Sequence, residues 1–350
     1  MTHSPPPAAP RRAVDIYSHI LPVDYFEQLR QVAPDRAALK RWLELPMLWD
    51  LDMRLELMAG TPGYQQILTL SSPPIEALGD SALGVRMARL ANDSMAALSA
   101  DHPAQFPGWV AALPLQTVTH AEAELERALR LGARGIQVFT NVNGAPLDDV
   151  GLEPIFAAMA EADLPIWMHP TRGPQFSDYV TEATSRYEIW WAFGWPYETS
   201  AAVARLVFSG VFDRYPDLKL ITHHLGGMIP FFEGRIRHGW DQMGSRTSGE
   251  DLSAVRADMR TPPVEAFRGI YGDTAISGSD VALRCGLDFF GPEHVLFGTD
   301  FPFDKEGGAI FLRETLAAID RLAVDDDTRN AIFSRNAMEL LRLDPERGRP

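Results

Sequence analysis

The sequence predicts a single α/β domain folded as a (β/α)₈ TIM barrel with a small insertion after strand 1. Short apolar runs of strand-forming residues recur along the chain, and a longer segment with helical spacing follows each of them. Eight such runs are present, and eight parallel strands with covering helices close most economically into a barrel. A doubly wound open sheet is the competing fold. It usually has a glycine-rich turn after its first strand, and "DIYSHILP" has none.

The predicted elements alternate along the whole chain. Strands are expected at 13–17, 64–70, 109–113, 135–139, 165–169, 219–223, 269–273 and 295–298. Helices are expected at 81–100, 121–131, 152–161, 199–214 and 308–323. The segment 22–51 is longer than a plain strand-to-helix connection, so we interpret it as an insertion that caps the mouth of the barrel.

The net charge and the composition limit the classes of molecule that this protein could bind. The 350 residues include 47 acidic and 32 basic residues, and this charge of −15 argues against nucleic acid or an anionic membrane as partner. A small anionic substrate stays compatible, because a pocket arginine acts locally. No apolar run reaches the roughly 18 residues that cross a bilayer, and the N-terminal residues lack the apolar stretch of a signal peptide.

One cysteine, Cys285, cannot form an internal disulfide, which agrees with a reducing compartment. We therefore expect a cytoplasmic protein. A proline-rich, flexible tail is predicted at 1–11 and a single catalytic domain at 12–345.

Polar side chains stand at the ends of four predicted strands. His19 follows the first strand, His169 ends the fifth, His223 and His224 close the sixth, and Asp300 follows the eighth. Strand carboxyl ends form the active-site face of a barrel, so these residues should converge there. A single histidine after a strand is more often a hydrogen-bonded core residue than a ligand. Four of eight strand ends with such groups favour a site for zinc, manganese or iron.

Several segments together are similar to the amidohydrolase superfamily, in its decarboxylase branch. They are "DIYSHILP", "GIQVFTNVNGAPLDD", "LPIWMHP", "FGWPYETSAAVARLVFSGVFDRYPDLKLITHHLGGMIPFFEGRIRHG" and "VLFGTDFPF", in this order and spacing. That branch includes aminocarboxymuconate-semialdehyde decarboxylase and γ-resorcylate decarboxylase. The resemblance covers residues 13 to 343, nearly the whole chain.

The resemblance implies roles for particular residues. His19, His169 and Asp300 correspond to metal ligands, with zinc the expected divalent metal and manganese the alternative. His224, six residues before Pro230, corresponds to the catalytic histidine, which leaves His223 as an extra residue behind the site.

Arginines near the expected site are candidates for binding a substrate carboxylate. Arg54 and Arg235 correspond to arginines that bind substrate carboxylates, the latter across a dimer interface, so a homodimer is expected. The alternative for each is a structural salt bridge. Arg172 in "HPTRGP" is a further candidate, with a solvated loop arginine as its alternative.

Tyr17 departs from the family pattern, because it stands where the family has the first histidine of His-x-His. A tyrosine is a neutral phenol at pH 7, with an ordinary pKa of about 10. It could ligate the metal as phenolate, or it could be an unbound donor to substrate beside a three-ligand site. Alternatively, metal affinity could be lost. We favour the donor, because three protein ligands with an open position suffice for catalytic zinc.

The predicted function is a metal-dependent, non-oxidative decarboxylase, a carboxy-lyase acting on a small anionic acid of aromatic or muconate-like type. His224 or Asp300 would supply the proton that replaces carbon dioxide. A metal-dependent hydrolase of a lactone or amide on the same barrel is the alternative. A metal-free, degenerate member is a third hypothesis, because of Tyr17. One or two aromatic side chains of the segment 187–198, such as Trp191 or Phe193, are candidates to stack on a flat substrate.

Overall fold

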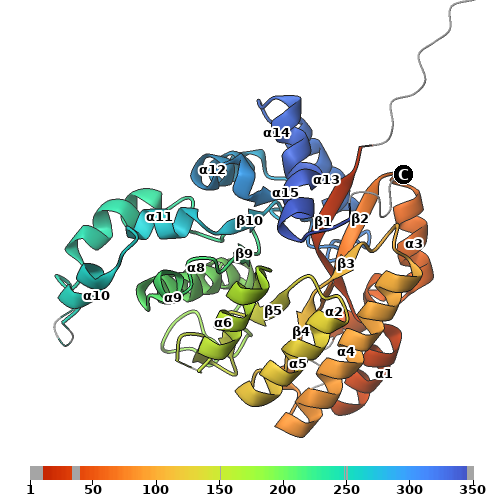
Figure 1. The fold of residues 1–350 in the computed structure, drawn as a ribbon, viewed down its shortest axis with the longest axis horizontal. Helices are drawn as coiled ribbons and strands as arrows, with labels where there is room; N and C mark the ends of the chain where they lie inside the picture. Colours follow the sequence, from red (N-terminus) through yellow and green to blue (C-terminus); the bar gives the residue numbers. More distant parts are fainter. Residues whose placement is uncertain (1–10, 34–39, 150, 248, 250, 345–350) are drawn as a thin grey trace, which may run out of the picture.

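Parallel strands form the wall of a barrel in this computed structural model, and helices surround it (Figure 1). The structure describes residues 11–33, 40–149, 151–247, 249 and 251–344. The wall strands are β1 (Ala13–Ile20), β2 (Tyr64–Leu70), β3 (Gly108–Trp109), β4 (Ala111–Ala112), β5 (Ile136–Phe139), β8 (Ile166–His169), β9 (Leu220–Thr222), β10 (Tyr271–Asp273) and β11 (Val295–Leu296). A small antiparallel hairpin, β6 (Asn141–Val142) and β7 (Ala145–Pro146), follows β5.

The wall consists of two parallel sheets, β1-β2-β3 and β11-β10-β9-β8-β5-β4, and backbone hydrogen bonds bridge the two junctions between them. At one junction β3 and β4 form a single wall position interrupted at Val110, whose N–H donates to the Leu68 carbonyl at 2.9 Å. At the other junction, Ile16 N–H donates to the Phe297 carbonyl at 2.9 Å, and His19 N–H donates to the Phe301 carbonyl at 2.8 Å. Each predicted strand coincides with one wall position, so the described residues confirm the (β/α)₈ barrel.

The wall separates two apolar cores. Every residue of β1 is buried, because one face of the strand points into the barrel and the other lies under helices. Val14 and Ile16 belong to the inner cluster with Trp167 and Ile221, whereas Ile20 belongs to the outer cluster. This burial on both sides explains why the strands read as continuous apolar runs.

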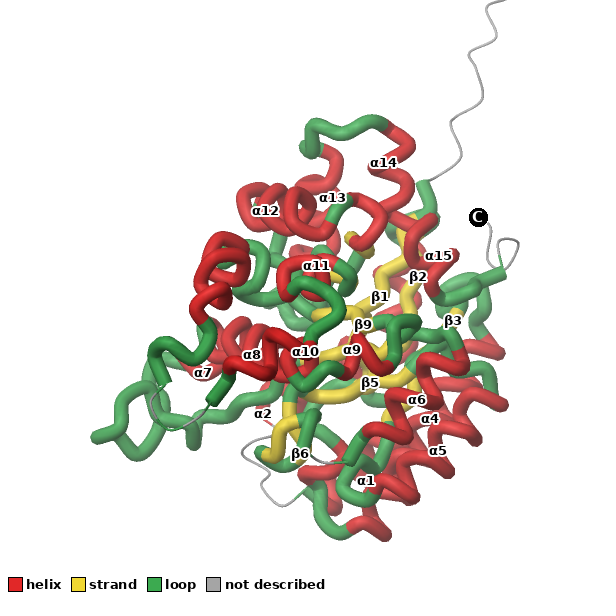
Figure 2. Tube along the Cα trace, turned by 60° about the vertical axis from the view of Figure 1, so that its left-hand side comes forward, coloured by secondary structure: helices red, strands yellow, loops and turns green. Residues whose placement is uncertain are grey.

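Helices cover the outside of the ring, and Figure 2 shows them around the central strands. They are α1 (Val23–Val32), α2 (Lys40–Leu43), α3 (Leu51–Ala59), α4 (Ser81–Asp101), α5 (Val118–Arg130), α6 (Glu153–Ala162), α7 (Ile189–Ala192), α8 (Gly194–Phe208), α9 (Val211–Arg214), α10 (Ser253–Asp258), α11 (Pro263–Arg268), α12 (Asp280–Phe290), α13 (Ala309–Asp320), α14 (Asp326–Asn330) and α15 (Asn336–Leu340). Short 3₁₀ or π turns are η1 (Pro46–Leu48), η2 (Ile75–Ala77), η3 (Arg235–Gly239), η4 (Trp240–Gln242), η5 (Pro292–His294) and η6 (Ala331–Arg335).

The sequence explains where several helices begin and end. The side chains of Asp50, Asp80 and Ser279 each accept a hydrogen bond from a backbone N–H three residues later, which caps α3, α4 and α12. The prediction of one helix over 199–214 was wrong. Gly210 adopts a φ of 75° and divides the segment into α8 and α9, since this left-handed conformation cannot continue a helix.

The predicted insertion contacts the carboxyl ends of the wall strands. Trp42 donates from Nε1 to Oγ of Ser71, just after β2, at 3.0 Å, and Arg41 donates to the carbonyl of Phe303. Residues 34–39 of this insertion, 1–10 of the predicted tail and the end of the predicted domain at 345 lie outside the described residues. Across the described part of the chain, no helix is long and apolar enough to cross a membrane.

Candidate functional site

Histidines from three strand ends meet at the carboxyl-terminal mouth of the barrel. His19 is the second-last residue of β1, His169 ends β8 and His223 follows β9. One nitrogen of each lies within 4.8 Å of a nitrogen of the other two, and all three residues are buried. One ligand atom each of His223, His224 and Asp300 forms a second cluster of the same size. The structure therefore brings His19, His169, His224 and Asp300 together, as the strand ends predicted.

Each imidazole of the first cluster is held through Nδ1. His169 Nδ1 lies 2.6 Å from the carbonyl oxygen of Pro170, and a carbonyl only accepts, so Nδ1 carries the proton. His223 Nδ1 is bonded to Oδ2 of Asp273, and His19 Nδ1 lies 3.4 Å from the hydroxyl of Thr69. The Nε2 atoms are consequently left for the centre of the site, and that of His19 is buried without a hydrogen bond among the described residues.

Asp300 lies between the imidazoles. Its carboxylate oxygens are 3.4 Å from Nε2 of His19, 3.3 Å from Nε2 of His223 and 3.6 Å from Nε2 of His224. Burial acts to raise the pKa of Asp300, but the close contacts with the three imidazoles outweigh it and hold the pKa well below its ordinary value. Asp300 is therefore an anion at the centre of the cluster.

The histidines differ in charge. Burial lowers the pKa of His19 and His224, and lowers the pKa of His169 still further with the help of the neighbouring imidazoles. Burial also acts on His223, yet the carboxylates of Asp273 and Asp300 raise its pKa to about 9. Imidazole nitrogens and an anionic carboxylate are groups that bind a transition-metal cation. Nε2 of His19 is buried and has no hydrogen-bond partner among the described residues, and a bound cation would supply that partner. The residues of the cluster therefore fit a cation.

Two of these residues have strained backbones. His224 has a φ of 55° and Asp300 a φ of 63°, both in the left-handed region that residues with a Cβ rarely adopt. Such conformations cost about 1–3 kcal/mol each and cluster at functional sites. The strain sets the direction in which both side chains leave the strand ends.

Tyr17 lies inside the cluster. Its ring stacks on His223, with 3.9 Å between centroids and 21° between planes, and its hydroxyl is buried with no hydrogen-bond partner among the described residues. Burial and the charges of Asp273 and Asp300 raise the pKa of Tyr17 well above its ordinary value of 10. Among the described residues the hydroxyl is thus neutral, and its role as a donor to substrate stays a prediction.

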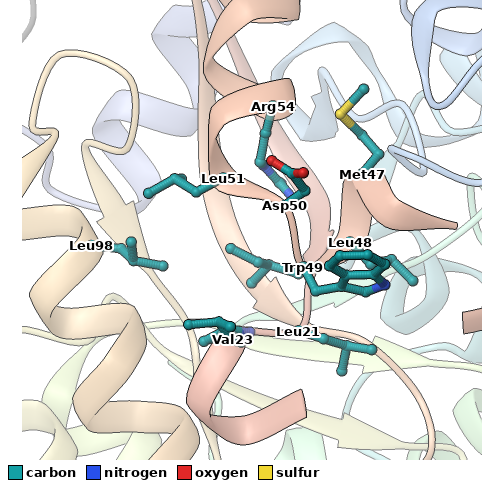
Figure 3. A pocket seen from close by; sticks show the side chains of 11 residues that line it. Leu21, Val23, Met47, Leu48, Trp49, Asp50, Leu51, Arg54 and Leu98 are labelled. Carbon is teal, nitrogen blue, oxygen red and sulfur yellow. The ribbon is translucent and has the colours of Figure 1, made fainter. Parts of the chain in front are cut away.

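Arg54 is held by protein groups behind β1. The guanidinium donates from Nε to Gln66 and from Nη1 to the carbonyl of His19, both at 2.7 Å, while Nη2 has no partner among the described residues. Burial lowers its pKa to about 10. Figure 3 shows Arg54 beside a small, mainly apolar cavity with Trp49, Leu51 and Leu98. None of the clustered histidines lines that cavity, so the role of Arg54 in substrate binding stays a prediction.

The other two arginines lie in different surroundings. Arg172 is partly buried, donates to Glu198 at 2.7 Å and lies over the ring of Phe176. Arg235, in η3, is exposed, and its guanidinium lies 6.0 Å from the ring centroid of Phe232. Substrate binding by Arg172 and by Arg235 stays a prediction.

Trp195, in the first turn of α8, packs against the cluster, as do Phe139, 5.3 Å from His169, and Phe303, 5.4 Å from His19, between ring centroids. The ring centroid of Trp195 lies 5.6 Å from that of His169 and 6.2 Å from that of His224, and Nε1 donates to the carbonyl of Arg172 at 3.2 Å. Trp191 and Phe193, the candidates from the sequence to stack on a flat substrate, are 45% and 74% exposed, and the ring of Trp191 lies 6.4 Å from that of Trp195. Their role in stacking stays a prediction.

Sequence reasoning missed three residues of the site. His223 was placed behind the site, but it belongs to both clusters. Asp273, which holds His223, ends an ordinary apolar strand, and Trp195 is one of six aromatics in one segment. The doublet His223-His224 was the one signal in the sequence that could have pointed to the first of them.

The chain is similar to known decarboxylases. The amidohydrolase family model matches residues 30–343. The chain is 30% identical over 300 residues to 2-amino-3-carboxymuconate-6-semialdehyde decarboxylase of Dictyostelium discoideum, covering 85% of this chain and 78% of that one. It is 31% identical over 323 residues to γ-resorcylate decarboxylase of Polaromonas sp. strain JS666, covering 87% and 91%.

A solved structure supports the same relationship. A dihydroxybenzoic acid decarboxylase from Polaromonas sp. JS666, with bound manganese and the inhibitor 2-nitroresorcinol, superposes with a TM-score of 0.76 at 26% identity. The match covers 95% of this chain and 97% of that one.

Proposed function

This chain belongs to the amidohydrolase family, and we infer from that premise that it is a metal-dependent, non-oxidative decarboxylase, a carboxy-lyase. The observation that carries the inference is the pair of clusters at the barrel mouth: His19 and His169 lie with His223, and Asp300 lies with His223 and His224. Asp300 joins the two, because its carboxylate is also 3.4 Å from Nε2 of His19. The relatives named above are decarboxylases, so the hydrolase alternative is not favoured. The intact cluster likewise argues against a degenerate, metal-free member.

The proposed metal ligands are His19, His169 and Asp300, through their Nε2 atoms and a carboxylate oxygen. We propose zinc as the divalent cation, because imidazole nitrogens with one carboxylate suit it, and manganese as the alternative present in the Polaromonas structure. When bound, the cation supplies a Lewis acid that polarises an oxygen of the substrate carboxylate or an adjacent hydroxyl.

His224 is the proposed proton donor. Loss of carbon dioxide requires a proton on the ring carbon that carried the carboxylate, and general acid catalysis of this kind is worth about 10² to 10⁴ in rate. Asp300 has a lowered pKa and remains an anion, so it suits the cation better than proton transfer. An anionic substrate beside His224 favours the imidazolium form and so raises its pKa.

The proposed substrate is a small hydroxylated aromatic acid, for which three residues supply contacts. Trp195 offers an aromatic face above His224, and flat rings stack on such faces. The Tyr17 hydroxyl, which has no partner among the described residues, would donate to a substrate oxygen. Arg172 would attract the carboxylate at the mouth. A muconate-like acid is the second substrate class, because of the Dictyostelium relative.

Assembly and location complete the proposal. We propose a homodimer in the cytoplasm, with exposed Arg235 reaching the partner's site and a small organic acid as substrate. The acidic net charge of −15 supports a partner that is neither nucleic acid nor an anionic membrane.

Product analysis tests the proposal. Purified protein is incubated with hydroxybenzoates and muconate-like acids, and carbon dioxide and the ring product are quantified before and after chelation and after resupply of zinc or manganese. We expect one molecule of carbon dioxide per turnover and loss of release on chelation. Asp300→Asn should be folded but nearly inactive. A ring-opened product that keeps every carbon, or full turnover in Asp300→Asn, would contradict the proposal.

A further inference from the structure

Position 17, two residues before His19, carries a tyrosine, so His19 is the one imidazole that β1 brings to the cluster. His223, from β9, supplies another imidazole in the same space. Its ring is stacked on that of Tyr17, 3.9 Å away. One of its nitrogens lies within 4.8 Å of nitrogens of both His19 and His169.

We propose that His223 is a metal ligand of this protein and that Tyr17 supports its ring. The inference rests on the proposed function in so far as both require a divalent cation at this cluster. It assigns three imidazoles, those of His19, His169 and His223, and the carboxylate of Asp300 to the cation. His224 then remains free for proton transfer.

The hydrogen bonds of Asp273 hold the imidazole of His223 in position. Oδ1 of this buried carboxylate accepts from the backbone N–H groups of Leu225 at 3.2 Å and Ala275 at 3.0 Å. Oδ2 is bonded to Nδ1 of His223. A carboxylate that holds Nδ1–H leaves Nε2 facing the site, where a bound cation would take the place of the Nε2 proton. This is the arrangement of a metal-binding histidine and its supporting carboxylate.

The stacking of the rings fixes the direction of that nitrogen. His223 lies 3.9 Å from the ring of Tyr17 and 3.8 Å from the ring of His224, and it is fully buried. Nε2 of His223 lies 3.3 Å from Oδ1 of Asp300, and the same oxygen lies 3.4 Å from Nε2 of His19. The two nitrogens therefore face one carboxylate oxygen, as two ligands of one cation would.

X-ray absorption spectroscopy of the zinc-loaded full-length protein tests the proposal directly. The wild type should fit three imidazole ligands, and His224→Gln should keep all three. A fit to two imidazoles in the wild type, or the loss of one in His224→Gln, would overturn the assignment of His223.

Metal affinity provides a second measurement, by competition with a chromophoric chelator and by metal content after gel filtration. We expect His223→Gln to weaken zinc binding by at least 100-fold and Asp273→Asn by about 10- to 100-fold. Tyr17→Phe should stay within about threefold of the wild type, as should the control His120→Gln, whose side chain is exposed on α5. Wild-type affinity in His223→Gln, or a loss confined to Tyr17→Phe, would overturn the proposal.

These readouts separate the inference from the proposed function, because neither measures carbon dioxide. Three imidazoles on zinc without carbon dioxide release from any acid would refute the function and leave the ligand assignment standing. Metal-dependent release of carbon dioxide from a site with two imidazole ligands would support the function and refute the assignment of His223. If His223→Gln fails to fold by circular dichroism, the wild-type spectrum and Asp273→Asn decide the question.

Discussion

The imidazole of His224 packs under the indole of Trp195, with 6.2 Å between ring centroids and 26° between ring planes. This offset stacking places an aromatic face next to the group that we propose as the proton donor. Trp195 is kept in position by the hydrogen bond from its Nε1 to the carbonyl of Arg172. The pair therefore defines one wall of the space in which a flat acid would lie.

Trp195→Ala should raise KM for an aromatic acid by about tenfold, since an aromatic pair contributes roughly 0.5–1.5 kcal/mol beyond its burial. Trp195→Phe should raise KM by a smaller factor, because phenylalanine keeps an aromatic face. Phe193→Ala is the matched control, as its side chain is 74% exposed. Steady-state kinetics check the three variants, and a larger effect in Phe193→Ala would refute the placement of the substrate.

His224→Gln should reduce kcat by about 10² to 10⁴, because it removes the proton donor and keeps a polar side chain. Its metal content should equal that of the wild type, since His224 is not among the proposed ligands. Carbon dioxide release and elemental analysis measure the two properties on one preparation. Normal turnover in this variant would assign the proton to another residue.

Arg54→Leu should destabilise the protein by about 2–4 kcal/mol. The substitution leaves the buried side chain of Gln66 and the His19 carbonyl without their donor. Urea unfolding measures this loss. The exposed Arg235→Ala should leave the free energy of unfolding unchanged and is the control. Wild-type stability in Arg54→Leu combined with a raised KM would instead support a direct contact with substrate.

Glu76 makes stability depend on pH. Burial raises the pKa of its carboxyl from 4.5 to about 7. Folding therefore favours the neutral carboxyl. The stabilisation that this gives the folded state is complete below pH 4.5 and is lost as pH rises through 7. The wild type should therefore lose up to roughly 1.4 kcal/mol per pH unit between these values.

Glu76→Gln, which stays neutral, should lack this fall in stability. Urea unfolding of both proteins between pH 4 and 9 provides the comparison. Parallel profiles for the two proteins would contradict the raised pKa.

The amino-acid sequence determined the barrel and much of its site. Each predicted strand, including 13–17 and 295–298, coincides with a wall strand, because burial on both faces imposes a continuous apolar run on every one. Strand order then placed His19, His169 and Asp300 at one end of the barrel, since the carboxyl ends of parallel strands share a face.

Only the tertiary structure decided how the neighbours of those residues act. Whether His223 or His224 faces the centre depends on the left-handed φ of His224 and on a bond to Asp273, fifty residues away. The interpretation of Arg54 likewise depended on Gln66 and on the carbonyl of His19. Periodicity reports which face of an element is apolar, but hydrogen bonds between distant strands form only when the ring closes, so these pairings leave no local signal in the sequence.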